Sequence, residues 1–378
     1  MRGAEYAAES DRLGELLREM VERGASDLHL TPGRAPTLRV DGALTTSRDD
    51  SALEAGHTLG LVRSVLTSLQ RRRFEDDGEL DFAFEVPDLA RFRGACYRQR
   101  GECAVALRHI PTRPPTFEEL ALPPALGRLA ERSRGMVLVT GPTGSGKSTT
   151  LAALVDVINR RMRGHILTVE DPIEFLHRSR RCLVSQREIG TDAESFSSAL
   201  RHALRQDPDV ILVGEMRDLE TIAAALTIAE TGHLVLSTLH TNSAVDTVSR
   251  IVDAFPAEQQ RRVRSQLASV LEGVATQILV PRESGGGRVA AVEVLVCTGA
   301  VRAVIRDDRS HQLRSLMQAG RRHGMQTLND DLARLYLEGR ITLGAALGRS
   351  PDPAELRRRT GESAAEPESA GGDRGGWG

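Results

Sequence analysis

The chain has 378 residues, of which 40% are hydrophobic, 27% charged and only 3% aromatic, and its formal net charge is -2. This length allows two domains with separate cores, and the composition is typical of a soluble globular protein. The near-neutral charge and the sparse aromatic residues favour neither non-specific DNA binding nor a base-stacking surface, so no nucleic-acid partner is expected.

The four cysteines do not form a C-x-x-C pair, so neither a zinc site nor a disulfide framework is predicted. The sequence has no apolar run of about 18 residues and no N-terminal signal pattern. We therefore expect a cytoplasmic protein.

Residues 1–110 predict a small α+β domain. A helix is expected near 9–23 and a helical stretch over 52–74. The expected strands are 26–30, 37–42, 80–86, 91–100 and 102–110.

A proline-rich linker is predicted at 111–124, because five prolines there prevent any regular element. Residues 125–350 alternate strands with helices, which predicts an α/β domain with a largely parallel sheet. Its expected strands are 136–140, 165–169, 210–213, 234–238 and 277–280, followed by a hairpin with a glycine turn near 285–287. Residues 351–378 are of low complexity and are expected to be disordered.

The segment GPTGSGKSTT at 141–150 fits the P-loop pattern G-x-x-x-x-G-K-[ST], in which backbone N–H groups surround a nucleotide's phosphates. It follows an apolar run and precedes a helical pattern, as a P-loop should. Lys147 is the only lysine among fifty basic side chains, and its compact ammonium suits the β- and γ-phosphates of ATP. Ser148 offers a hydroxyl to Mg²⁺. The predicted nucleotide contacts are Gly141, Pro142, Thr143, Gly144, Ser145, Gly146, Lys147, Ser148 and Thr149.

Two further strands are followed by carboxylates. HILTVEDPIEFLH at 165–177 carries Glu174 after its strand, where a carboxylate can deprotonate the water that attacks the γ-phosphate. The alternative is an acidic loop that caps the next helix. DVILVGEMRD at 209–218 ends in Glu215 and resembles a Walker B strand, but its residues leave open whether Glu215 acts on the metal or on water.

Two histidines flank the strand in AETGHLVLSTLHTNS, residues 229–243. His233 precedes the strand and His240 follows it, and a histidine there can hydrogen-bond the γ-phosphate and respond to its loss. Taken singly, each is more typical of a structural hydrogen-bonding residue. Two of them around one strand, after the two preceding motifs, favour function.

Together, GPTGSGKST, EDPIEF, GEMRD and TGHLVLSTLHTN resemble the secretion ATPase superfamily of type II secretion and type IV pili, within which the chain is most similar to the pilus retraction ATPases of the PilT type. ASDLHL, GMQTLNDDL and VRAVIRDD at 301–308 point the same way, the last resembling the retraction motif A-I-R-x-L-I-R-E. Departures occur at Val301, Val304 and Asp307, and Gly94 and Ala95 occupy the V-N positions of the family's R-F-R-V-N-x-F-x-Q pattern.

The resemblance implies a RecA-like P-loop NTPase domain after a smaller N-terminal α+β (PAS-like) domain. It also implies a homohexameric motor, peripheral to the inner membrane through the pilus machinery, that hydrolyses ATP with Mg²⁺ to drive a platform protein in retraction and twitching motility. A paralogous ATPase is a further candidate partner. By the same match Glu174 is the general base, Glu215 supports Mg²⁺ and its water, and His233 and His240 sense the γ-phosphate. The first-domain arginines expected to close on the phosphates are Arg91, Arg93 and Arg100.

Several alternatives stay open at this stage. Within the superfamily they are a pilus-assembly or type II secretion ATPase, whose usual four-cysteine zinc motif is missing, and an accessory PilU-like paralogue. Outside the motor class, the chain could be a non-hydrolysing nucleotide-binding partner of such a ring. A nucleic-acid motor on a similar core is disfavoured by the absence of a basic or aromatic groove.

Overall fold

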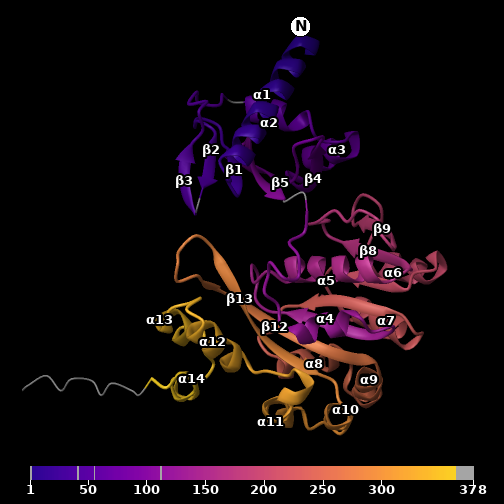
Figure 1. Cartoon of the computed structure of the whole chain (residues 1–378). Coiled ribbons are helices and arrows are strands. Elements are labelled where there is room, and N and C mark those ends of the chain that lie inside the picture. Colours follow the sequence, from indigo (N-terminus) through magenta and orange to yellow (C-terminus); the bar gives the residue numbers. More distant parts are fainter. Residues whose placement is uncertain (1, 41, 55, 111–112, 363–378) are drawn as a thin grey trace, which may run out of the picture. The chain divides into compact units, whose positions relative to one another are not determined.

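The computed structural model describes residues 2–40, 42–54, 56–110 and 113–362. It is an α/β protein with one six-stranded and one seven-stranded sheet (Figure 1). The chain forms two compact units, which are described separately. The first consists of residues 1–119, 130–137 and 148–238, and the second of residues 120–129, 138–147 and 239–378. Because this division crosses the expected ATPase domain, the domain boundaries at 110 and 125 remain a prediction.

The six-stranded sheet belongs to the first unit and has the order β3-β2-β1-β6-β5-β4, with every neighbouring pair antiparallel. Its strands are β1 (Asp27–Leu30), β2 (Thr37–Val40), β3 (Ala43–Thr46), β4 (Glu79–Val86), β5 (Ala90–Gln99) and β6 (Glu102–Ile110). Its helices are α1 (Arg2–Glu22), α2 (His57–Arg63) and α3 (Ser68–Asp77). This confirms the expected α+β character, although β3 was not predicted.

The helical stretch expected over 52–74 is two helices rather than one. Thr67 has extended backbone geometry and caps the start of α3. Its hydroxyl accepts a hydrogen bond from the Gln70 N–H, and the Gln70 side-chain oxygen accepts one from the Thr67 N–H. Such a capping box starts a new helix and ends any continuous helical path before it.

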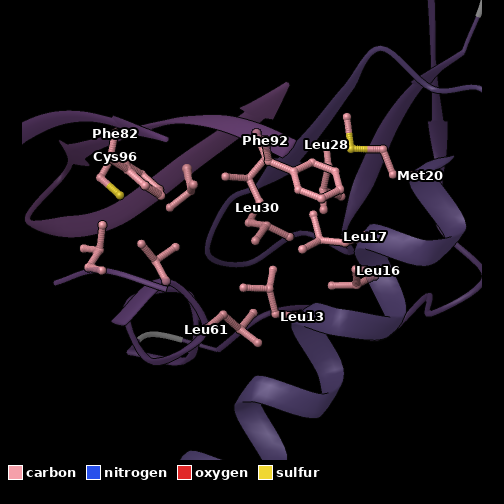
Figure 2. Close-up of a cluster of buried hydrophobic side chains, with 14 of the residues drawn as sticks. Leu13, Leu16, Leu17, Met20, Leu28, Leu30, Leu61, Phe82, Phe92 and Cys96 are labelled. Atoms are coloured by element: carbon pink, nitrogen blue, oxygen red, sulfur yellow. The ribbon is translucent and has the colours of Figure 1, made fainter. Parts of the chain in front are cut away.

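The core of this part lies between α1 and the sheet. Figure 2 shows Leu13, Leu17 and Met20 of α1 beside Leu28 and Phe92 of the strands, and all of these side chains are at most 1% exposed. The strand residues alternate between buried and half-exposed, as expected for a sheet with one covered face.

Gly94 in β5 explains one departure from the family pattern. It lies directly opposite Phe82 of β4, and a Cβ at Gly94 would come within 2.2 Å of the Phe82 ring. The aromatic ring occupies the space that a valine side chain would need, so the glycine and the phenylalanine depend on each other.

The seven-stranded sheet has the order β13-β12-β7-β11-β10-β8-β9. Its strands are β7 (Gly135–Thr140), β8 (His165–Glu170), β9 (Leu183–Glu188), β10 (Val210–Val213), β11 (Leu234–Leu239), β12 (Leu271–Pro281) and β13 (Arg288–Val296). The pairs β8–β9, β8–β10 and β10–β11 are parallel, as expected from the alternating pattern. The long hairpin of β12 and β13 is antiparallel (Figure 1). Strand β9, at the end of the sheet, was not predicted.

The remaining helices follow and separate these strands. They are α4 (Pro124–Ala130), α5 (Lys147–Arg161), α6 (Phe196–Ala203), α7 (Leu219–Glu230), α8 (Ala244–Asp253), α9 (Ala257–Val270), α10 (Gly299–Arg306), α11 (Leu313–Ala319), α12 (Leu328–Leu337), α13 (Leu343–Leu347) and α14 (Pro353–Thr360). Within the predicted linker, residues 113–123 contain no helix or strand, and α4 begins at its last residue.

Helix α14 corrects the prediction of a disordered tail from 351. Asp352 caps this helix by accepting a hydrogen bond from the Glu355 N–H at 2.9 Å, and Leu356 is fully buried against α12 and β12 neighbours. The prediction is therefore wrong for residues 353–360. Residues 363–378, with Trp377, lie outside the described part of the chain.

Candidate active site

The P-loop lies between β7 and α5, in the expected order of strand, glycine loop and helix. Every residue of β7 is buried, and α5 begins at Lys147, so that Ser148 and Thr149 lie in its first turn. A helix that begins on the motif's lysine directs its free N–H groups and its positive dipole end toward the loop. This arrangement provides the backbone donors that a phosphate requires.

Three glycines give the loop its shape. Gly141, Gly144 and Gly146 have φ angles of 141°, 75° and 86°, which side-chain-bearing residues rarely adopt. At Gly141 space is also limiting, because a Cβ there would come within 2.2 Å of the Gln277 carbonyl oxygen on β12.

Gly141→Ala should therefore destabilise the protein far more than Gly144→Ala. We expect the free energy of unfolding to fall by about 3 kcal/mol or more at Gly141, from overpacking and backbone strain together. At Gly144 the space is open, so the cost should be only the backbone strain of about 1–2 kcal/mol. Denaturant unfolding of both variants measures the difference, and equal costs would contradict this account of the loop.

Lys147 is 9% exposed and its ammonium lies over the loop itself. Its Nζ donates to the Gly141 and Pro142 carbonyl oxygens at 2.9 and 3.1 Å. The loop thus keeps a positive charge at its centre. When a phosphate binds, the Lys147 ammonium can donate to phosphate oxygens in place of these two carbonyls.

Gln277 of β12 is hydrogen-bonded to the P-loop, and the sequence analysis did not predict this contact. Its Nε2 donates to the Ser145 carbonyl oxygen at 2.6 Å, and the residue is 1% exposed. The Ser145 hydroxyl is also buried, yet it has no hydrogen-bond partner among the described residues. A buried hydroxyl inside a phosphate-binding loop fits a site whose remaining partner is a ligand.

In the first unit, the segment after β8 is organised by Glu170. Its Oε1 accepts hydrogen bonds from Thr168 at 2.7 Å and from Gln186 at 3.2 Å, and the Gln186 amide also donates to the Phe175 oxygen at 2.9 Å. Burial raises the pKa of Glu170. Glu170 therefore holds the loop together, and the half-buried Glu174 is the carboxylate that the loop presents.

A second organising carboxylate, Glu188 at the end of β9, was also missed. It is 8% exposed, and its Oε2 accepts from the Ile173 N–H at 3.1 Å and from Arg91 at 2.8 Å. Of the three predicted arginines, the structure joins Arg91 to the Glu174 loop through this carboxylate. Arg93 lies opposite Arg108 of β6, and Arg100 occupies the exposed turn after β5 with φ 53°.

Glu215 follows β10 in a loop held by backbone bonds on both sides. The Gly214 N–H donates to the Val169 oxygen at 2.8 Å, and the Met216 N–H donates to the Thr238 oxygen at 3.1 Å. The Glu215 side chain is 19% exposed and accepts from Arg217 at 2.9 Å. Its carboxylate is therefore mostly buried and is held by Arg217 at the carboxyl end of the strand.

The two histidines lie at opposite ends of β11 and are not brought together. His240 follows the strand, and its Nδ1 lies 3.5 Å from the Thr143 hydroxyl of the P-loop. His233 precedes the strand, and its ring bonds to the Thr231 hydroxyl at 3.0 Å and to the Ile228 oxygen at 3.2 Å. His240 therefore lies beside the P-loop, whereas the ring of His233 is hydrogen-bonded at the end of α7, and the phosphate-sensing role of both histidines stays a prediction.

The segment VRAVIRDD forms most of α10. Val301, Val304 and Ile305 face the core, so the departures at 301 and 304 keep an apolar side chain in a buried position. Arg302 donates to the last carbonyls of α9 at 2.8 and 2.9 Å and pairs with Glu272 at 2.5 Å. The first part of the segment therefore joins two helices, whereas Asp307 lies near its exposed end.

No cluster of three or more histidine, cysteine or acidic side chains that could hold a metal occurs in the part of the chain described by the structure. The predicted Mg²⁺ ligands, Ser148 and Glu215, are too few for a protein-only site, which suits an ion that arrives with the nucleotide's phosphates. Among residues 2–362 that are described, no helix is long and apolar enough to cross a membrane.

An α/β fold with a glycine loop, a buried loop lysine and a helix starting on it defines a P-loop nucleotide-binding protein. The chain belongs to the type II/IV secretion system protein family, whose model matches residues 7–347. It is 50% identical over 328 residues to the type IV pilus retraction ATPase PilT of Pseudomonas aeruginosa, covering 87% of this chain and 95% of that protein.

Two further comparisons agree. The type IV pilus ATPase PilU of the same organism is 42% identical over 343 residues, covering 91% of this chain and 90% of that protein. The crystal structure of the pilus retraction motor PilT with bound ADP matches with a TM-score of 0.85 at 49% identity, covering 91% of this chain and 98% of that one. These findings confirm the family and the RecA-like fold expected from the motifs.

Proposed function

We propose that this chain is the subunit of a homohexameric motor ATPase that powers type IV pilus retraction, and with it twitching motility. The nucleotide part rests on one observation above all, the buried Lys147 held over a glycine loop at the start of α5. The retraction part rests on the 50% identity to a PilT retraction ATPase over 95% of that protein's length.

Each candidate residue has a role in ATP hydrolysis. Lys147 and the loop N–H groups bind the β- and γ-phosphates, and Ser148 and Glu215 hold Mg²⁺ and its water. Bound Mg²⁺ supplies positive charge to the phosphate oxygens. Glu174 takes the proton of the attacking water. His240 contacts the γ-phosphate, and its loss after hydrolysis changes the hydrogen bonding next to Thr143.

First-domain arginines complete the site when the motor closes. Arg91 is favoured over Arg93 and Arg100, because it already pairs with Glu188, which also binds the loop that carries Glu174. An arginine that exchanges a carboxylate for a phosphate would couple hydrolysis to domain movement.

The partners of such a motor are five further copies of the chain in a ring and the pilus platform protein of the inner membrane. The ring acts in the cytoplasm, next to the membrane. A PilU-type paralogue is a candidate second ATPase, since a PilU is similar over most of this chain. No nucleic acid is required.

A steady-state ATPase assay with and without DNA tests the enzymatic part. We expect Mg²⁺-dependent hydrolysis that DNA leaves unchanged. Absence of hydrolysis under conditions where ATP binds would favour the non-hydrolysing partner, and strong stimulation by DNA would favour a nucleic-acid motor.

A further inference from the structure

In the first unit, arginines that are far apart in the sequence gather where the strands β7, β8 and β9 begin. Three segments lead into β7, β8 and β9: ERSR at 131–134, RRMRG at 160–164 and RSRRC at 178–182. The first and third are loops, and the second consists of the last two residues of α5 and the loop after them. We call these three segments the arginine rim. Of their 14 residues (4 + 5 + 5), eight are arginine and one is acidic, a formal charge of +7 in a chain whose total is -2.

Backbone hydrogen bonds show that the three segments share one edge. Four backbone bonds with N···O distances of 2.9–3.1 Å connect the starts of neighbouring strands. Their donor and acceptor residues are Gly135 and His233, Leu234 and Asp209, Asp209 and His165, and Leu183 and Gly164. Since β8, β9 and β10 are parallel, this edge is opposite to the one where Glu170 and Glu215 follow their strands. A partner at the rim would leave the carboxyl edge accessible.

A buried amide holds two of the segments against each other. Asn159 is 1% exposed, and its Nδ2 donates to the Arg178 oxygen at 2.8 Å. Its Oδ1 accepts from the Arg180 N–H at 3.0 Å and from the Cys182 N–H at 3.4 Å. The loop 178–182 is thus attached to the end of α5, so the arginines of both segments occupy defined positions.

Carboxylates near the rim neutralise only part of its charge. Arg160 and Arg180 share Asp156 at 2.7 and 3.6 Å, and Arg161 pairs with Glu131. Even these paired side chains are 47%, 54% and 65% exposed. The segments before β10 and β11 lie between those before β8 and β7, and they add Arg205, Asp207, Asp209 and Glu230. With these residues and Asp156 counted, the surface keeps a formal charge of +4 (7 + 1 - 4).

We propose that the arginine rim binds directly to a membrane surface that contains anionic phospholipids. Guanidinium groups match the geometry of phosphate oxygens, and several of them spread over one surface suit an array of headgroups. Leu183, directly after the third segment, is 60% exposed, and Met162 lies among the arginines of the second segment. Such apolar side chains suit the headgroup boundary. The three segments contain no aromatic residue that could stack on bases, which disfavours single-stranded nucleic acid.

This inference goes beyond the proposed motor function and does not depend on it. A chain with no role in pili could still bind vesicles through the rim, and a retraction motor could reach the membrane only through its platform partner. The two ideas therefore fail separately.

The test is co-sedimentation of the full chain with vesicles of phosphatidylglycerol and phosphatidylcholine, or of phosphatidylcholine alone. We expect binding only to the anionic vesicles, weakening as salt is raised. Arg163→Glu with Arg181→Glu should reduce the apparent affinity by about 25-fold or more, since each basic side chain near an anionic surface contributes about 5-fold.

Arg261→Glu with Arg262→Glu on α9 is the matched control, because it makes the same charge change at two neighbouring exposed arginines outside the rim. The control should bind vesicles like the parent, and both double variants should keep the parental nucleotide affinity, which shows that they are folded. Equal loss in the rim and control variants, binding to neutral vesicles, or tighter rim binding to duplex DNA than to anionic vesicles would overturn the proposal.

Discussion

Lys147→Ala should lose ATP binding by about 30-fold to several-thousand-fold, and hydrolysis should fall below detection. The expected size follows from the about 2–5 kcal/mol that is lost when one member of a buried, hydrogen-bonded charge pair is removed. No other lysine exists in the chain to replace it. Titration of a fluorescent ATP analogue measures the affinity, and a steady-state assay of phosphate release measures turnover.

Two controls make this result specific. Lys147→Arg keeps the positive charge but has a planar donor fork, so it should bind ATP more weakly than the parent and more tightly than the alanine variant. The unfolding midpoint of Lys147→Ala without nucleotide should stay close to the parental value. An alanine variant that binds ATP with parental affinity would contradict the P-loop assignment.

Glu174→Gln should keep ATP binding while turnover falls by about 10²- to 10⁴-fold, because an amide cannot take the proton of the attacking water. The ATP affinity of the variant should therefore equal that of the parent, while its single-turnover rate of hydrolysis should fall. Rapid-quench measurement of ADP formation from a preformed complex with ATP tests this directly.

Glu170→Gln is the matched control, four residues earlier in the same segment. Its Oε1 accepts hydrogen bonds from Thr168 and Gln186, and an amide oxygen can accept them as well. Because burial already raises the pKa of Glu170, a neutral replacement should cost little. We expect turnover within a few-fold of the parent. If Glu174→Gln retained parental turnover, the base would be Glu215 or another group.

The P-loop and the buried strands could be predicted from the sequence because they depend on local patterns. A glycine loop needs particular residues at fixed spacing, and strands such as β7 and β10 are continuous apolar runs. The helix start at Lys147 follows from the same motif.

What could not be predicted depends on contacts between distant segments. Strand β9 reads LVSQRE, with little apolar character, because it lies at the end of the sheet. Without β9, nothing indicated that Glu188 would bind both Arg91 and the Glu174 loop. Gln277 gave only a weak signal, a glutamine at the start of an apolar strand, and its role depends on the P-loop 132 residues away.

The histidines and the C-terminal helix show the same limit. Chain order places His233 before β11 and His240 after it, but the approach of His240 to Thr143 of the P-loop depends on the position of β11 beside β7 in the sheet. In the tail, the sequence PDP marked a break, but Asp352 and Pro353 start a helix that Leu356 attaches to the core.

The most direct test of the central claim is the number of surface pili per cell in a strain that lacks this protein, compared with its parent and with a strain complemented by Glu174→Gln. If the protein is a retraction motor, we expect the deletion strain to carry excess pili that no longer retract. The strain complemented by Glu174→Gln should carry the same excess. Cells without pili would contradict retraction and assign the same nucleotide chemistry to pilus assembly.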